Sequence, residues 1–142
     1  MHPLRDYFQH CLYFSAGTLF RHISHMAEEE FAQLGLSPSH AFLLMLVLER
    51  PGSTQKEYAG ALRLAPSTVT RLVEALERKG LVERRSQSRT SQVFPLAKGK
   101  GLAEPMEAAW ERLFERYKTV LGDDACSDLT ERIHAANELL EG

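Results

Sequence analysis

The chain has 142 residues, with 17 Lys and Arg against 19 Asp and Glu, and a formal net charge of −2. Its 44% hydrophobic and 25% charged residues indicate one globular domain, or one domain with appended helices, rather than a disordered chain. No apolar run approaches the roughly 18 residues that a membrane span requires, and the N-terminus lacks the pattern of a secretion signal. We therefore expect a cytoplasmic protein without a membrane partner.

The charge is unevenly distributed along the sequence. Residues 50–100 hold eleven basic and four acidic residues, a net charge of +7, so the remaining residues carry −9. A basic middle segment between acidic flanks is typical of a phosphate-binding module on a separate scaffold. A chance cluster of solvated Lys and Arg would give the same count, so charge alone leaves both interpretations open.

The N-terminal third predicts two helices. Apolar residues recur at helical spacing over residues 4–34, in a helix that can bend at Gly17. Ser37 is a candidate N-cap for a second helix, with Pro38 at its first position. Residues 42–48 are apolar nearly all round, which predicts the central core helix.

The middle segment predicts two short helices and a hairpin. Residues 54–57 form a capping box that starts a helix ending near residue 62. Pro66 begins the next helix, which ends at Gly80. Ala65, at the N-cap position of this second helix, has no side chain that can cap it. Apolar and polar residues then alternate over 81–85 and 92–96, around a polar hairpin tip at 86–91. Helical spacing resumes from residue 102 to 121 and again from 129 to 140.

Two short helices joined by a tight turn form the helix-turn-helix arrangement that reads DNA. On the second helix, one stripe holds polar and charged side chains opposite the apolar stripe; its members are Ser67, Thr70, Arg71, Glu74 and Arg78. An Arg near a helix N-terminus can bond guanine O6 and N7 in the major groove, and hydroxyls can bond bases or phosphate. An ordinary amphipathic surface helix is the alternative. The basic window and the hairpin that bears Arg84, Arg85 and Arg89 favour DNA binding by a winged helix.

Three stretches in this order carry a more specific resemblance: residues 54–57 (TQKE), 66–73 (PSTVTRLV) and 79–84 (KGLVER). They resemble the MarR family of winged-helix transcription regulators, most strongly over residues 36–85. The resemblance implies a mainly α fold with a small β-hairpin wing. It divides the chain into a winged helix-turn-helix at 37–100 and helical dimerisation regions at 1–36 and 101–142.

The resemblance also implies partners and contacts. A homodimer would place one winged helix on each half of a near-palindromic double-stranded DNA operator. The residues that would contact DNA are Ser67, Thr68, Thr70 and Arg71 on the helix, with Arg84 and Arg89 on the wing. The wing departs from the family, whose tip usually carries Asp-x-Arg, because this chain reads Ser88-Arg89-Thr90 there.

Regulators of this family commonly bind a small aromatic or anionic effector between the dimer helices and the DNA-binding region. Candidate pocket residues are Tyr13, His22, His25, His40 and Phe42, although each also fits an ordinary structural role. His22 and His25 could share a metal ion, but no cysteine or carboxylate completes a site by spacing, so we expect no metal.

Cys11 offers a different sensing chemistry. Some family members sense peroxides through one cysteine in the first helix, and Cys11 lies among aromatic residues there. A buried apolar cysteine is the alternative.

The sequence shows no motif of an enzyme and no cofactor-binding motif. We therefore expect a dimeric, sequence-specific DNA-binding regulator, a repressor relieved by a small-molecule effector. The alternatives are a peroxide-sensing regulator acting through Cys11, and a winged-helix protein-interaction module without DNA binding.

Overall fold

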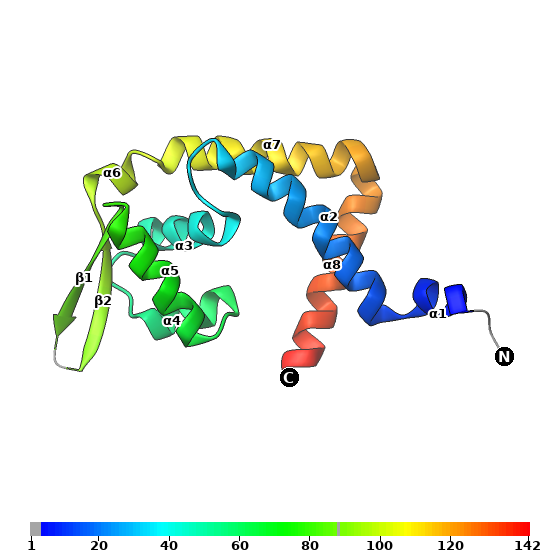
Figure 1. Cartoon of the computed structure of the whole chain (residues 1–142), viewed down its shortest axis with the longest axis horizontal. Helices are drawn as coiled ribbons and strands as arrows, with labels where there is room; N and C mark the ends of the chain where they lie inside the picture. Colours follow the sequence, from blue (N-terminus) through cyan, green and yellow to red (C-terminus); the bar gives the residue numbers. More distant parts are fainter. Residues whose placement is uncertain (1–3, 88) are drawn as a thin grey trace.

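The computed structural model describes residues 4–87 and 89–142 (Figure 1). It contains helices α1 (Leu4–His10), α2 (Leu12–Ala32), α3 (Pro38–Glu49), α4 (Gln55–Leu62) and α5 (Pro66–Arg78), strands β1 (Val82–Gln87) and β2 (Thr90–Pro95), and helices α6 (Ala97–Lys100), α7 (Ala103–Leu121) and α8 (Asp123–Glu141). The fold is therefore mainly helical with one antiparallel hairpin, as the sequence predicted. Within the described residues, we find no helix with the length and apolar character to cross a membrane.

The elements form two parts, which we call the head and the arm. The head consists of residues 37–100, from α3 through α6, with the hairpin at its outer side (Figure 1). The arm consists of α1, α2, α7 and α8, in which α2 and α7 lie side by side and connect to opposite ends of the head sequence. Segments from both ends of the chain thus build one helical arm.

Helix α3 is the centre of the core, as its apolar sequence predicted. It packs against α2, α5, α7 and β2, and buries Ala41, Leu43, Leu44 and Val47. The Ser37 side chain caps its first turn by accepting a hydrogen bond from the His40 backbone N–H at 3.3 Å. Phe42 is the exception on this helix, because it remains 36% exposed and packs against the ring of Phe31.

The helix-turn-helix forms as predicted, with two local differences. Glu57 N–H donates to the Thr54 hydroxyl at 3.1 Å, but the Glu57 carboxylate accepts from that same hydroxyl rather than from the Thr54 amide. The turn between α4 and α5 passes through Arg63 in the left-handed conformation, with φ of 56°. No sequence signal points to this conformation, because glycine and asparagine are the residues that usually adopt it.

The first helix does not follow the sequence prediction. The break occurs at Cys11, whose backbone is extended, and α2 runs uninterrupted through Gly17. Glycine lowers helix propensity by about 1 kcal/mol but keeps its backbone N–H, so the helical hydrogen bonds continue through it. Nothing in the residues around Cys11 explains why the helix is interrupted there.

The last helix also differs from the prediction, because it begins at Asp123 rather than near residue 129. Gly122, with φ of 90°, turns the chain directly into α8, and two aspartates stand in its first turn. Carboxylates are favourable at a helix N-terminus, so Asp123 and Asp124 belong to the helix and not to the preceding break.

The wing is longer than predicted and is joined to the head. Its strands pair from Val82 with Pro95 to Gln87 with Thr90. The loop before α4 lies along β2, where Gly52 N–H donates to Val93 O at 2.8 Å and Val93 N–H donates to Ser53 O at 3.1 Å. These backbone bonds fix the inner part of the wing to the helix-turn-helix.

The junction between the wing and α7 depends on a glycine that the sequence did not single out. Gly99 in α6 is buried, and a Cβ atom built on it would overlap the carbonyl oxygen of Leu81 and lie 3.3 Å from Leu44 Cδ1. Only a residue without a side chain allows α6 to approach the start of the wing this closely.

We predict that Gly99→Ala lowers the free energy of unfolding by about 1–3 kcal/mol, because a backbone oxygen must move to admit the methyl group. Denaturant unfolding followed by circular dichroism measures the change. Gly101→Ala is the matched control, since its Cβ would meet nothing closer than 3.4 Å. Equal effects of the two substitutions would contradict this account of Gly99.

Candidate nucleic-acid interface

The outward face of α5 presents the polar residues that the sequence predicted. The apolar stripe Val69, Leu72, Val73 and Leu76 is buried against the head. The opposite face leaves Ser67 and Arg71 exposed, while Thr68 and Thr70 are half-buried. The burial of one stripe thus determines which side chains the other face can offer to a ligand.

Two basic side chains of α5 are not committed to interactions within the head. Among the described residues, none forms a hydrogen bond or ion pair with the guanidinium of Arg71 or Arg78. Lys56, at the start of α4, is likewise exposed. An Arg that has kept its five N–H donors can bind an external acceptor without losing an internal bond.

Thr70 occupies a different environment from its neighbours on α5. Its hydroxyl lies 2.8 Å from Gln55 Oε1 on α4 and 3.0 Å from the carbonyl oxygen of Pro66. This contact joins the two helices of the helix-turn-helix. Gln55 could not be predicted from the sequence, because the two residues are 15 positions apart and no local sequence pattern indicates the contact.

The C-terminal end of α5 is fixed by contacts with three other segments. Lys98 Nζ donates to the Lys79 carbonyl at 3.0 Å, and Lys79 Nζ donates to the Gly35 carbonyl at 3.2 Å. Arg84 Nε on β1 lies 2.7 Å from Glu77 Oε1 on α5. Together they hold the helix end against the wing and the segment before α3.

The three arginines of the wing differ in their surroundings. The Arg84 pair with Glu77 uses Nε, and the two terminal nitrogens of Arg84 have no bond to a described residue. Arg85 pairs with Glu83 and lies 4.1 Å from the centre of the Phe94 ring. Arg89 is exposed at the tip and pairs with no described residue, whereas the neighbouring Ser88 lies outside the described residues.

A buried tyrosine fastens α4 to the loop before it, which itself bonds to β2 of the wing. The Tyr58 hydroxyl on α4 donates to the Arg50 carbonyl at 2.5 Å and accepts from Ser53 N–H at 3.3 Å. Burial raises the pKa of Tyr58 above its ordinary value, so this hydroxyl stays protonated as a donor at neutral pH.

The five candidate pocket residues do not all come together in one chain. Tyr13, on α2, is 90% exposed, and His22 and His25 lie further along that helix. His40 and Phe42 belong to α3 in the head. Burial, followed by the positive charges of Lys79 and Arg78, lowers the pKa of His40, and its Nδ1 lies 2.5 Å from the Ser37 hydroxyl oxygen.

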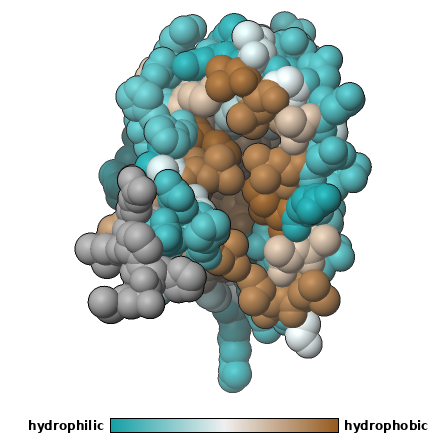
Figure 2. Space-filling model, turned by 90° about the vertical axis from the view of Figure 1, so that its right-hand side faces the viewer, coloured by the Kyte–Doolittle hydropathy of each residue, from teal (hydrophilic) through white to brown (hydrophobic). Residues whose placement is uncertain are grey.

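An apolar cleft lies in the arm, between α2 and α7. It has a volume of about 540 Å³. Its lining consists mainly of apolar side chains with Arg21, His22 and His25 among them: Leu19, Ile23, Met26, Tyr117, Val120 and Leu121. Figure 2 shows hydrophobic side chains gathered in a hollow on the face that the free end of the arm presents.

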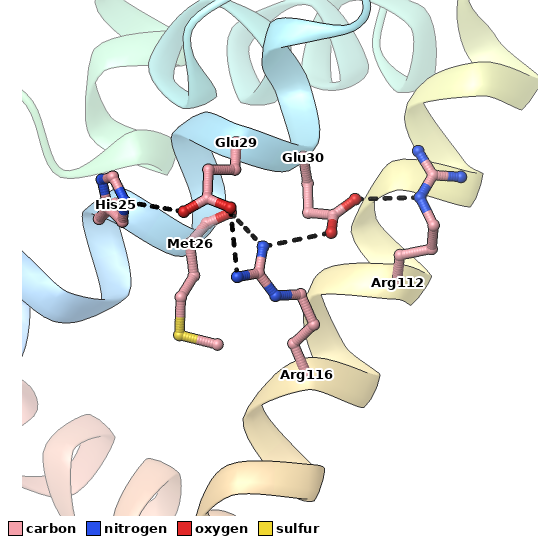
Figure 3. Close-up of polar contacts among 6 residues, drawn as sticks. All are labelled: His25, Met26, Glu29, Glu30, Arg112 and Arg116. Atoms are coloured by element: carbon pink, nitrogen blue, oxygen red, sulfur yellow. Dashed lines mark hydrogen bonds and ion pairs between the residues drawn. The ribbon is translucent and has the colours of Figure 1, made fainter.

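An ionic cluster joins α2 to α7 beside this cleft (Figure 3). Glu30 is central, because its carboxylate lies 3.0 Å from Arg112 Nε and 3.3 Å from Arg116 Nη1, and only 13% of its side chain is exposed. Arg116 also pairs with Glu29 and donates to the Met26 carbonyl at 3.3 Å. The cluster lies at the head end of α2 and in the middle of α7. Glu29 and Glu30 therefore link two helices.

The two cysteines lie in opposite environments. Cys11 is exposed and lines a cleft at the start of the arm with Asp6, Tyr7 and His10, whereas Cys126 is buried in α8. Among the described residues, no group of three or more His, Cys, Asp or Glu side chains could hold a metal ion.

Comparison with known proteins finds one family model and several solved structures that resemble this chain. Residues 36–89 match the model of the MarR family. No curated relative matches the sequence. The solved structure of the repressor CouR bound to a 23-mer DNA duplex superposes with a TM-score of 0.85 at 19% identity, over 96% of this chain and 99% of that one.

Two other solved structures give the same result. The Staphylococcus aureus MepR–DNA complex has a TM-score of 0.79 at 18% identity, covering 91% of this chain and 97% of that one. CouR from Rhodococcus jostii RHA1 bound to p-coumaroyl-CoA has a TM-score of 0.75 at 21% identity, with coverage of 91% and 93%.

These matches confirm the predicted resemblance. The chain has the winged-helix fold with flanking helices that these solved structures share, and residues 36–89 match the MarR family model.

Proposed function

We propose that the protein is a dimeric, sequence-specific DNA-binding transcription regulator that acts as a repressor and is released by a small-molecule effector. The observation that carries the proposal is the outward face of α5, which holds Arg71 free of internal partners beside the wing. The match to the MarR family and the DNA-bound structures of CouR and MepR support it.

In this proposal, the head reads DNA at two places. Arg71, Ser67 and Thr68 lie in the major groove, where a guanidinium can take guanine O6 and N7 and the hydroxyls can take base edges or phosphate. Arg89 enters the minor groove from the wing tip without the usual Asp beside it. Arg84 contacts the backbone through its terminal nitrogens while Glu77 orients its Nε.

The arm provides the dimer interface. Among the described residues, thirteen of the fifteen large hydrophobic side chains that remain exposed lie on α1, α2, α7 and α8. Cys126 is the one buried residue of α8. A 19-residue helix that buries so little within its own chain gains its stability from packing elsewhere. A second copy related by twofold symmetry would cover these surfaces and set the two heads on the two half-sites.

The effector acts on the spacing of the heads. The apolar cleft between α2 and α7, with Arg21, His22 and His25 among its residues, suits a molecule with an aromatic body and a negative charge. CouR was solved with p-coumaroyl-CoA, a ligand of that kind. Such a ligand would release the operator by favouring a different angle between α2 and α7. The loss of DNA affinity cannot exceed the difference in the ligand's affinity for the DNA-binding and the released arrangements.

We predict that Arg71→Ala weakens binding to the selected operator about tenfold or more and binding to random duplex much less, because the lost contacts are to a base. Fluorescence anisotropy at fixed salt measures both affinities. Lys100→Ala, which removes an exposed positive charge of the head outside α5, is the matched control, for which we expect a similar small loss on both duplexes. Equal losses of affinity on the two duplexes for Arg71→Ala would mean that Arg71 contacts only phosphate.

The salt dependence of binding separates the proposed function from its alternative. Binding of the unsubstituted protein to DNA that does not weaken with rising salt would support a protein-interaction module.

We predict that Val120→Glu dissociates the dimer. Val120 lies in the apolar cleft of the arm and is 73% exposed in one chain, so a carboxylate there is tolerated by the monomer but buried by a partner. Removing a charge from water at an interface weakens association by about two orders of magnitude. Sedimentation velocity measures the state, and Leu64→Glu in the head, 37% exposed, is the control that stays dimeric. A dimer that survives Val120→Glu would contradict this interface.

A further inference from the structure

Gln55 and Thr70 form the side-chain hydrogen bond that connects the first helix of the helix-turn-helix to the second. Thr70 is half-buried on α5, and its oxygen lies 2.8 Å from the side-chain amide of Gln55 at the start of α4. Neither residue belongs to the apolar core, so the contact does not serve to pack that core. The contact lies at the edge of the outward face of α5, which is the surface that we propose binds DNA.

The hydrogen atoms of this contact can be counted. Thr70 has one hydroxyl proton, yet two acceptors lie within bonding distance, the Pro66 carbonyl at 3.0 Å and Gln55 Oε1. Both bonds can be satisfied if the Gln55 amide is turned over, because the oxygen and nitrogen of an amide occupy equivalent positions. The Gln55 NH₂ group then donates to Thr70, and Thr70 donates to Pro66. These two hydrogen bonds use Thr70 Oγ1 both as acceptor and as donor, and they leave Gln55 Oε1 facing away from α5.

Resting on the proposed DNA-binding function, we infer that Gln55 is a specificity-determining residue and that Thr70 positions it. Gln55 Oε1, held outward by the Thr70 hydroxyl, accepts a hydrogen bond from the exocyclic amino group of an adenine or cytosine at the edge of the site. Thr70 contacts no base itself. The direct base contact assigned to Thr70 by resemblance therefore passes to a residue on the preceding helix.

The competing arrangement is a hydrogen bond from the Gln55 NH₂ group to a DNA phosphate, instead of a hydrogen bond from a base to Gln55 Oε1. The two arrangements predict different binding behaviour. A base contact through Oε1 produces a preference at one base pair, whereas a phosphate contact strengthens binding to all sequences alike. Gln55→Glu separates them, because a carboxylate retains the acceptor but repels phosphate. Under our inference, Gln55→Glu weakens overall affinity and keeps the base-pair preference.

The experiment measures binding of the full-length dimer to its selected operator and to duplexes that each change one base pair. We expect Gln55→Ala and Thr70→Val each to reduce the preference at one common base pair by about five- to tenfold. The double variant should lose no more than either single variant, because both act through one contact. Thr70→Ser, which keeps the hydroxyl, should retain the preference within about twofold.

Thr119→Val is the matched control for the loss of a threonine hydroxyl. Thr119 bonds the carbonyl of Glu115 in the same manner as Thr70 bonds Pro66, but on α7 in the arm. It should leave the preference unchanged. If Thr70→Val fails to fold, as judged by its thermal transition, then Gln55→Ala and Gln55→Glu decide the question.

The outcomes separate this inference from the proposed function. An unsubstituted protein with no base-pair preference at any position would overturn both. A selective unsubstituted protein whose Gln55→Ala variant keeps every preference would overturn the inference alone. The inference also fails if Gln55→Ala weakens all duplexes equally, or if the effects of Gln55→Ala and Thr70→Val multiply.

Discussion

The orientation of the outward face of α5 depends on the burial of the apolar stripe on the opposite side of that helix. Val69, Leu72, Val73 and Leu76 are almost completely removed from solvent within the core around α3. A helix fixed along one side in this way cannot rotate without exposing that stripe to water, which costs on the order of 1.5–3 kcal/mol for each fully buried side chain. The side chains opposite it are therefore presented in one orientation, and Arg71 needs no internal partner to remain on the outside.

The rest of the molecule controls where that face is held. Helices α2 and α7 connect the arm to the head, and the cluster of Glu30 with Arg112 and Arg116 joins these two helices (Figure 3). Toward the free end of the arm, hydrophobic side chains remain exposed in the single chain (Figure 2), and in the proposed dimer a second copy covers them. In the proposed mechanism, dimerisation, effector binding and DNA binding all depend on one quantity, the distance and orientation between the α5 helices of the two subunits.

Sequence reasoning recovered what local rules determine. Helical spacing, the Ser37 and Thr54 caps and the alternating pattern after Gly80 were sufficient for the head. A charge of +7 over residues 50–100, against −9 elsewhere, distinguished most of the head from its flanks. Contacts between distant segments were not recoverable, because no periodicity encodes them. The Gln55–Thr70 bond, the Glu77–Arg84 pair and the space requirement of Gly99 all belong to this kind. The bend considered at Gly17 does not occur, since propensity is a weak guide where the rest of a helix holds together.

The most direct test of this account is selection of bound sequences from a pool of random DNA duplexes by the full-length protein. A dimer with two heads placed by the arm should enrich a near-palindromic consensus whose half-sites lie ~34 Å apart, one helical turn, or a multiple of it. Recovery of a pool without enrichment, or of single half-sites without a symmetric mate, would contradict the central claim that the arm pairs two DNA-reading heads.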